Sequence, residues 1–106
     1  MHRISFYVPV ADAAAVKDAL FAAGAGRIGA YDQCSWDCPG RGQFRPLEGA
    51  DPAVGSVGGL EAVEELKVET VCEDVLLEPV LRALVSAHPY EEPAYAAWPV
   101  TTLADF

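Results

Sequence analysis

Hydrophobic and polar residues alternate with a period of two in two segments of the chain, residues 3–9 and 62–73. In the first segment Ile4, Phe6 and Val8 share one side, with two polar residues and a tyrosine on the other. In the second segment one side consists of Leu66, Val68, Thr70 and Cys72. Alternation of β-branched and aromatic residues with polar ones is typical of half-buried strands. The sequence therefore predicts two strands that each turn one face toward the core.

Apolar residues recur at helical spacing over residues 13–23, where the stripe consists of Val16, Ala19, Leu20 and Ala23. Asp12 is a plausible N-cap, because a short acceptor side chain can bind the free N–H groups of the first helical turn. Gly24 follows as a stop, since glycine readily takes the left-handed geometry that ends many helices. We therefore expect a helix of about three turns here.

A second helix is predicted over residues 74–87, with an apolar stripe of Val80, Leu81, Leu84 and Val85. Pro79 must lie in its first turn, where the missing N–H leaves no helical hydrogen bond unmade. Pro89 disfavours helical geometry at His88, so the helix is expected to end there. A final strand is predicted over residues 94–100.

The middle of the chain, residues 24–61, contains all nine glycines. Within it, residues 31–37 have the pattern of a strand. Residues 43–47 have that of a short edge strand, because Pro46 and the nearby glycines discourage a central position in a sheet. Residues 48–59 are predicted to form a long loop, and loops of this length in small domains are usually functional or mobile.

The order of these elements fits two split βαβ halves. It predicts an α+β, ferredoxin-like (βαββαβ) sandwich: an antiparallel sheet with two helices on one face, a short extra edge strand and a long Gly-rich loop. No linker interrupts the pattern, so residues 1–106 are expected to form a single domain. The other sheet face is left bare, and Tyr7, Val71 and Trp98 are its candidate residues. Because an exposed apolar face needs a partner, we expect a homo-oligomer, either a dimer or a trimer.

The chain is strongly acidic, with 16 acidic against 7 basic residues and a formal net charge of -9. Nucleic acids and anionic membranes attract clustered Lys and Arg, so neither is an expected partner. No stretch reaches the roughly 20 apolar residues that span a bilayer, and the first residues do not have the pattern of a signal peptide. Three cysteines without a C-x-x-C pair do not suggest a secreted disulfide framework. We therefore expect a cytoplasmic protein.

The segment 88–93, with the sequence His-Pro-Tyr-Glu-Glu-Pro, is the most unusual in the chain. Two prolines stiffen it, and it offers the imidazole of His88 and the carboxylates of Glu91 and Glu92 at the end of a helix, where the helix dipole favours a cation. These groups can bind a divalent metal or transfer a proton. In the alternative, His88 caps the helix end, Tyr90 packs, and both glutamates face water.

Two of the three cysteines, Cys34 and Cys38, are only four residues apart. In a continuous strand they would lie about 13 Å from each other, too far for a disulfide or for one metal. A turn at residues 38–40 could bring them closer and allow a disulfide or a soft-metal site. Cys72 falls on the buried face of another strand. The alternative is that all three are small thiols that take no part in the chemistry.

No catalytic signature accompanies these residues, since H-E-x-x-H, G-x-S-x-G and the P-loop are all absent. Residues 24–29 match G-x-G-x-x-G, but a helix precedes them and a strand follows, the reverse of the dinucleotide-binding order. Cys34 with His88 is the only candidate pair of nucleophile and base. We therefore assign no catalytic residue and no cofactor-binding residue.

Two signatures, G-x-G-x-F-x-P at residues 40–46 and H-P-Y-E-E-P-A at residues 88–94, resemble the Nif-three-like family. The resemblance covers nearly the whole chain. More narrowly, the chain looks like a stand-alone version of the middle domain that some members carry as an insertion. That domain is similar in fold to the CutA and PII proteins, which are ferredoxin-like and form trimers. The resemblance also implies that the metal ligands of the full-length proteins lie in a flanking domain outside this sequence, so a cyclohydrolase-type activity is not expected to transfer.

The sequence supports three functional hypotheses. The first is a small oligomeric accessory module that binds a divalent cation, zinc or copper, or a small ligand. Its candidate metal ligands are His88, Glu91 and Glu92. Its candidate ligand or interaction loop consists of Cys34, Cys38, Gly40, Gly42, Phe44 and Arg45. The second is a protein-interaction or inhibitor module that acts through a sheet edge or through its thiols. The third, a metal-dependent hydrolase, is disfavoured because the flanking domain is missing.

Overall fold

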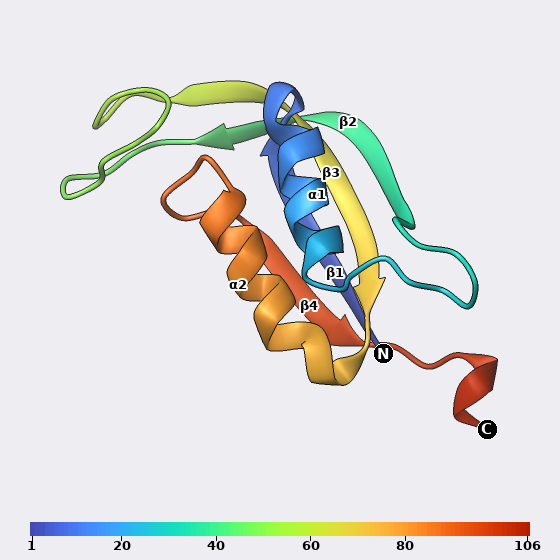
Figure 1. The fold of residues 1–106 in the computed structure, drawn as a ribbon. Helices are drawn as coiled ribbons and strands as arrows, with labels where there is room; N and C mark the ends of the chain where they lie inside the picture. Colours follow the sequence, from blue (N-terminus) through green and yellow to red (C-terminus); the bar gives the residue numbers. More distant parts are fainter.

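The computed structural model describes all residues, 1–106, as one antiparallel sheet with both helices on the same side (Figure 1). Its strands and helices are β1 (His2–Pro9), α1 (Ala13–Ala22), β2 (Ser35–Phe44), β3 (Glu61–Cys72), α2 (Leu77–Ala87) and β4 (Tyr95–Pro99). The sheet has four strands in the order β2-β3-β1-β4, and every neighbouring pair is antiparallel. The ferredoxin-like fold predicted from the sequence is confirmed.

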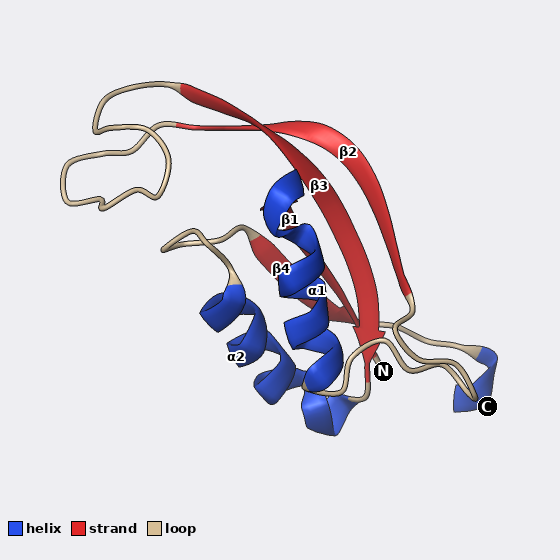
Figure 2. Ribbon diagram, turned by 45° about the horizontal axis from the view of Figure 1, so that its top comes forward, coloured by secondary structure: helices blue, strands red, loops and turns tan.

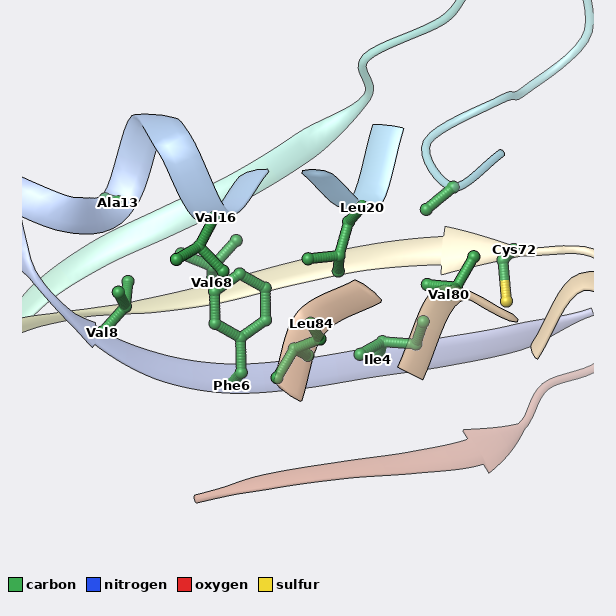
Figure 3. Close-up of a cluster of buried hydrophobic side chains, with 11 residues drawn as sticks. Ile4, Phe6, Val8, Ala13, Val16, Leu20, Val68, Cys72, Val80 and Leu84 are labelled. Atoms are coloured by element: carbon green, nitrogen blue, oxygen red, sulfur yellow. The ribbon is translucent and has the colours of Figure 1, made fainter. Parts of the chain in front are cut away.

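The core lies between the sheet and the two helices (Figure 3). Ile4, Phe6 and Val8 of β1 are fully buried, as the alternation predicted. They pack with side chains from three other elements, namely Val68, Val16, Leu20, Val80 and Leu84. Since burial of each large apolar side chain contributes about 1.5–3 kcal/mol, these side chains fix which face of the sheet the helices cover.

Both helices end where the sequence indicated. Gly24 follows α1 with a φ of 112°, a left-handed conformation that favours glycine. His88 follows α2 in an extended conformation, because Pro89 excludes the helical one. The start of α1 differs in detail: Asp12 occupies the N-cap position, but its side chain makes no capping hydrogen bond. Neither helix is long and apolar enough to cross a membrane.

Strand β2 differs from the prediction of one strand at 31–37 and a short extra edge strand at 43–47. It is a single strand of ten residues that continues through Pro39 and two glycines. These residues are tolerated because β2 is at the edge of the sheet, where a missing N–H or side chain disrupts little. Tyr31 lies outside the strand and forms only an isolated bridge with Ile28.

The β2–β3 hairpin extends beyond the rest of the sheet. Strand β1 pairs with residues 65–72 of β3, whereas β2 pairs with residues 61–70. Residues 41–64 therefore form a two-stranded projection with a long loop at its end, called the hairpin arm below (Figure 2). The arm and the C-terminal segment after β4 project at opposite ends of the molecule (Figure 1), which has extents of 50 × 24 × 22 Å.

The sheet face opposite the helices carries exposed aromatic side chains. Strand register places Trp98 beside Arg3 and places Trp36 and Tyr7 on the same face. Trp36 is 57%, Tyr7 42% and Trp98 39% exposed. Val71, which was also expected on this face, is buried. Its pairing with Arg3 still places Val71 on this face, so the exposed aromatic residues there are Tyr7 and Trp98, as predicted, and Trp36 in addition.

Candidate ligand-binding groove

A groove of about 1030 Å³ lies between the hairpin arm and the segment that follows α2. Residues 38–50 and 52–54 form one wall, and Tyr90, Glu91, Glu92 and Ala94 form the other. Its remaining lining residues, Tyr7, Trp36, Glu65 and Lys67, come from the sheet. The groove thus brings together the long loop and the two sequence signatures, residues 40–46 and 88–94, which are far apart in the chain.

Glu65 connects the two walls of the groove. Its side chain is only 8% exposed, which is unusual for a carboxylate. One of its oxygens, Oε2, accepts a hydrogen bond from the Tyr90 hydroxyl at 3.1 Å. The other, Oε1, lies over Gly42, where a Cβ atom would clash with it. A side chain at position 42 would therefore displace the end of the Glu65 side chain from its present position.

Tyr90 lies between the arm and the end of α2. Its ring contacts Phe44 with a centroid separation of 5.8 Å and His88 with one of 4.9 Å. Burial raises the pKa of Tyr90 to about 12, and the negative charge of Glu65 and their hydrogen bond act in the same direction. The phenol therefore stays protonated at neutral pH and can act as the donor to Glu65.

His88 holds this segment in place with both of its ring nitrogens. Nε2 lies 2.7 Å from the main-chain oxygen of Tyr7, and Nδ1 lies 3.1 Å from the main-chain N–H of Tyr90. A carbonyl only accepts and an N–H only donates, so the geometry selects a neutral ring with the proton on Nε2. The imidazole is buried and does not line the groove. Neither nitrogen is free to coordinate a metal without breaking one of these hydrogen bonds.

Glu91 and Glu92 do line the groove, beside the loop of the hairpin arm. Oε1 of Glu91 accepts a hydrogen bond from the main-chain N–H of Asp51 at 2.9 Å, which fastens the loop to the opposite wall. The structure contains no group of three His, Cys, Asp or Glu side chains arranged to hold a metal ion. The candidate metal ligands are thus adjacent in the chain, but His88 is directed to other partners.

Not all of the candidate loop residues belong to the groove. Five of them, Cys38, Gly40, Gly42, Phe44 and Arg45, line the groove. Cys34 does not; it precedes β2, and its carbonyl accepts a hydrogen bond from Thr70 at 2.8 Å.

The cysteines do not meet one another or His88. The turn considered at residues 38–40 is absent because β2 runs straight through them, so Cys34 and Cys38 keep the spacing of an extended chain. All three cysteines are free thiols. Cys34 is linked to Thr70, which pairs with Ile4, whereas His88 contacts Tyr7 three residues further along β1.

The sequence did not single out Glu65 as a site residue. It belongs to the polar side of the alternation in β3, which indicated a wet or interfacial face. Its burial depends on Gly42 from another strand and on Tyr90 from the segment after α2, and no local pattern reveals such contacts. The only local signal was the pair of glycines in β2, whose partner could not be identified.

Comparison with known proteins identifies relatives of this fold, although no protein-family profile matches the chain. The GTP cyclohydrolase 1 type 2 homolog of Mycobacterium leprae is 53% identical over 89 residues, which cover 84% of this chain and 23% of that protein. A Bacillus cereus protein related to NIF3 superposes with a TM-score of 0.81 at 42% identity, over 95% of this chain and 26% of its own. The periplasmic divalent cation tolerance protein CutA of Archaeoglobus fulgidus superposes with a TM-score of 0.68 at 20% identity, over 96% of this chain and 86% of its own.

The CutA likeness and the sheet topology define a ferredoxin-like domain of the CutA type. Within that class, the chain belongs to the Nif-three-like family, as its similarity to the cyclohydrolase homologues and to the NIF3-related structure shows. It spans about a quarter of the length of the curated relatives that it matches, for example 23% and 27%. The activity of the full-length proteins is therefore not a property established for this chain.

Proposed function

We propose that this chain is a non-catalytic accessory module that self-associates and binds a small ligand in the groove. One observation carries the ligand-binding part: Gly42 and Phe44 of one signature meet Tyr90 of the other at Glu65, and all four residues line the same groove. These contacts give the groove a defined shape and place its polar groups, as a small-molecule site requires.

The groove has the chemistry of a small-molecule site. Such sites are concave, largely apolar, and have volumes of about 300–1,000 Å³ with a few well-placed polar groups. Here the volume is about 1030 Å³, the aromatic residues are Tyr7, Trp36, Phe44 and Tyr90, and the polar groups are mainly charged side chains. A ligand of drug size is therefore supported better than a single ion.

The self-association part rests on the bare face of the sheet. Trp36, Tyr7 and Trp98 are all more than a third exposed there, without helices to cover them. They share this face with Arg3, Glu69 and Lys67, which form ion pairs with one another. Large aromatic side chains exposed on an uncovered sheet face favour a protein interface. The resemblance to the CutA and PII proteins favours a trimer over a dimer.

A thermal-shift screen with chemically diverse amines, carboxylates, phosphates and nucleosides would test ligand binding. A ligand present at 100 times its Kd stabilises the folded chain by about 2.7 kcal/mol. The stabilisation should be reduced in Phe44→Ala, which removes a groove wall, and kept in Val75→Ala, which alters an exposed residue outside the groove. A screen in which no compound raises the melting temperature of the wild-type chain would contradict the ligand-binding proposal.

A divalent cation, zinc or copper, is the alternative occupant. Glu91 and Glu92 could supply two carboxylates at the groove, but His88 would first have to release Tyr7 or the Tyr90 N–H. Calorimetry with zinc, copper and nickel on the wild type and on the Glu91→Gln/Glu92→Gln double variant would test it. Tight binding that the double variant loses would support the cation.

Neither hydrolysis nor thiol chemistry gains support from the site. The relatives are named as GTP cyclohydrolase homologues, but Cys34 and His88, the only candidate pair of nucleophile and base, lie apart. A disulfide between Cys34 and Cys38 would require these residues to meet, and β2 keeps them extended. An interaction through the exposed edge of β2 remains compatible with the accessory role.

A further inference from the structure

Glu65 has an acceptor atom that the protein itself does not use. Its side chain is more than nine-tenths buried, and its one hydrogen bond involves Oε2 and the hydroxyl of Tyr90. Oε1 has no hydrogen-bond partner, is located above Gly42, and belongs to the groove lining. An ionised carboxylate can accept about four hydrogen bonds, and a buried charge is costly until it is paired. This atom is therefore an acceptor in the groove that a ligand can use.

Aromatic side chains lie beside this carboxylate and further along the groove. Tyr90 donates to it directly, and the ring of Phe44 packs against Tyr90. Tyr7 and Trp36 line the same groove from the sheet. Aromatic faces attract cations through their quadrupoles, by about 0.5–1 kcal/mol when exposed and about 2 kcal/mol when desolvated. A carboxylate among aromatic rings is thus a suitable environment for an organic cation.

The charges of the groove lining also favour a cation. Its lining contains four carboxylates, Glu48, Glu65, Glu91 and Glu92, against three basic groups, Arg41, Arg45 and Lys67. Lys67 is already paired with Glu69 at 3.6 Å, which reduces its ability to neutralise a groove carboxylate. Arg41 and Arg45 are exposed side chains of the hairpin arm, whereas Glu65 is buried.

From this geometry we infer that the groove selects a small organic cation whose N–H groups bind Oε1 of Glu65, such as an ammonium, amidinium or guanidinium group on a planar body. This inference rests on the proposed ligand-binding function and specifies its chemistry. A planar N–H donor can bind the carboxylate in the plane of its oxygens while its body stacks against the aromatic walls.

Three probes of similar size but different charge would test the inference by calorimetry at neutral pH: benzamidine, a cation; benzamide, its neutral counterpart; and benzoate, an anion. We expect benzamidine to bind the wild-type chain at least tenfold more tightly than either of the others. Glu65→Gln should weaken benzamidine binding at least tenfold, whereas the same substitution at Glu78, an exposed residue of α2, should leave it unchanged.

A change in groove shape is separated from loss of the acceptor by a second variant. Tyr90→Phe keeps the ring that packs against Phe44 but removes the donor to Oε2, so that both oxygens become available. This variant should bind benzamidine at least as tightly as the wild type. If Tyr90→Phe weakens binding as much as Glu65→Gln does, the groove shape and not the carboxylate determines affinity, and the inference is wrong.

The outcomes also distinguish the inference from the proposed function. Equal or tighter binding of benzoate or benzamide, or an unchanged Kd in Glu65→Gln, would overturn cation selection and leave ligand binding intact. If compounds other than cations stabilise the chain in the thermal-shift screen and benzamidine does not bind, cation selection is likewise overturned and ligand binding stays intact. No binding by any probe and no stabilisation in the screen would overturn both.

Discussion

At the scale of single residues, the space above Gly42 decides whether Glu65 can reach Tyr90. An added Cβ at position 42 would clash with the end of the Glu65 side chain, whereas one at Gly40 meets nothing within 4 Å. Neither glycine has a positive φ, so backbone strain does not distinguish them. Gly42 and Gly40 are thus a matched pair that isolates the contact with Glu65.

We predict that Gly42→Ala lowers the free energy of unfolding by about 1–3 kcal/mol, because Glu65 must move away from its hydrogen bond while remaining in a buried region. Gly40→Ala should leave stability unchanged or raise it by up to about 1 kcal/mol, through a less flexible unfolded chain. Urea unfolding of both variants gives the comparison. In a Tyr90→Phe background the cost of Gly42→Ala should shrink, since the hydrogen bond is already absent; equal costs in both backgrounds would contradict the coupling.

The shifted titration of Tyr90 predicts a loss of stability at high pH. Its folded pKa of about 12 lies above the ordinary value of 10.0, so the folded chain holds the phenol proton more tightly than the unfolded chain. The resulting stabilisation is fully present below pH 10 and is lost as pH rises through about 12. Urea unfolding between pH 9 and pH 12, on the scale of these two pKa values, should show a steeper decline for the wild type than for Tyr90→Phe. Tyr31→Phe, which alters an exposed tyrosine, should decline like the wild type.

At the scale of elements, the loop of the hairpin arm is fastened to the segment after α2 by one hydrogen bond, from the Asp51 N–H to Glu91. We predict that Glu91→Ala speeds hydrogen exchange at the Asp51 amide by about fivefold, since a lost bond of about 1 kcal/mol changes the opening equilibrium by that factor. Glu92→Ala removes a neighbouring carboxylate that makes no such bond and should leave this rate unchanged. Equal exchange rates in both variants would show that the loop is held by other contacts.

The elements also show how far the sequence could be read. β1, β3, α1 and α2 each contain a periodic apolar face that can be recognised from neighbouring residues in the sequence. All four elements were predicted close to their observed bounds. β2 has no such face, because it is an edge strand with exposed side chains, and it was therefore divided into two short strands. The sequence predicted no groove; it indicated only that the stiff segment 88–93 and the glycine-rich loop were candidate binding segments. Glu65 was missed because its burial arises from contacts across three separate elements.

At the scale of the whole molecule, the bare sheet face and the net charge have opposite effects on self-association. The exposed aromatic residues favour contact between copies, and a stable interface needs about 1,000 Å² or more of buried surface. The formal charge of -9 on each copy opposes that contact. Salt screens charges beyond about 8 Å at physiological ionic strength. If the bare face forms the interface, self-association should therefore become tighter as salt concentration increases.

We predict that light scattering of the purified chain gives a mass that is a multiple of 11.3 kDa, and that Trp98→Glu shifts it toward the monomer. Trp98 is on the bare face and outside the groove lining, so this change tests the interface without removing a groove residue. Val85→Glu introduces the same charge on α2, on the opposite side of the sheet, and should keep the wild-type mass. A monomeric wild type at all salt concentrations would contradict the oligomer. An equal shift in both variants would point to added charge, and not to loss of the aromatic contact, as the cause of dissociation.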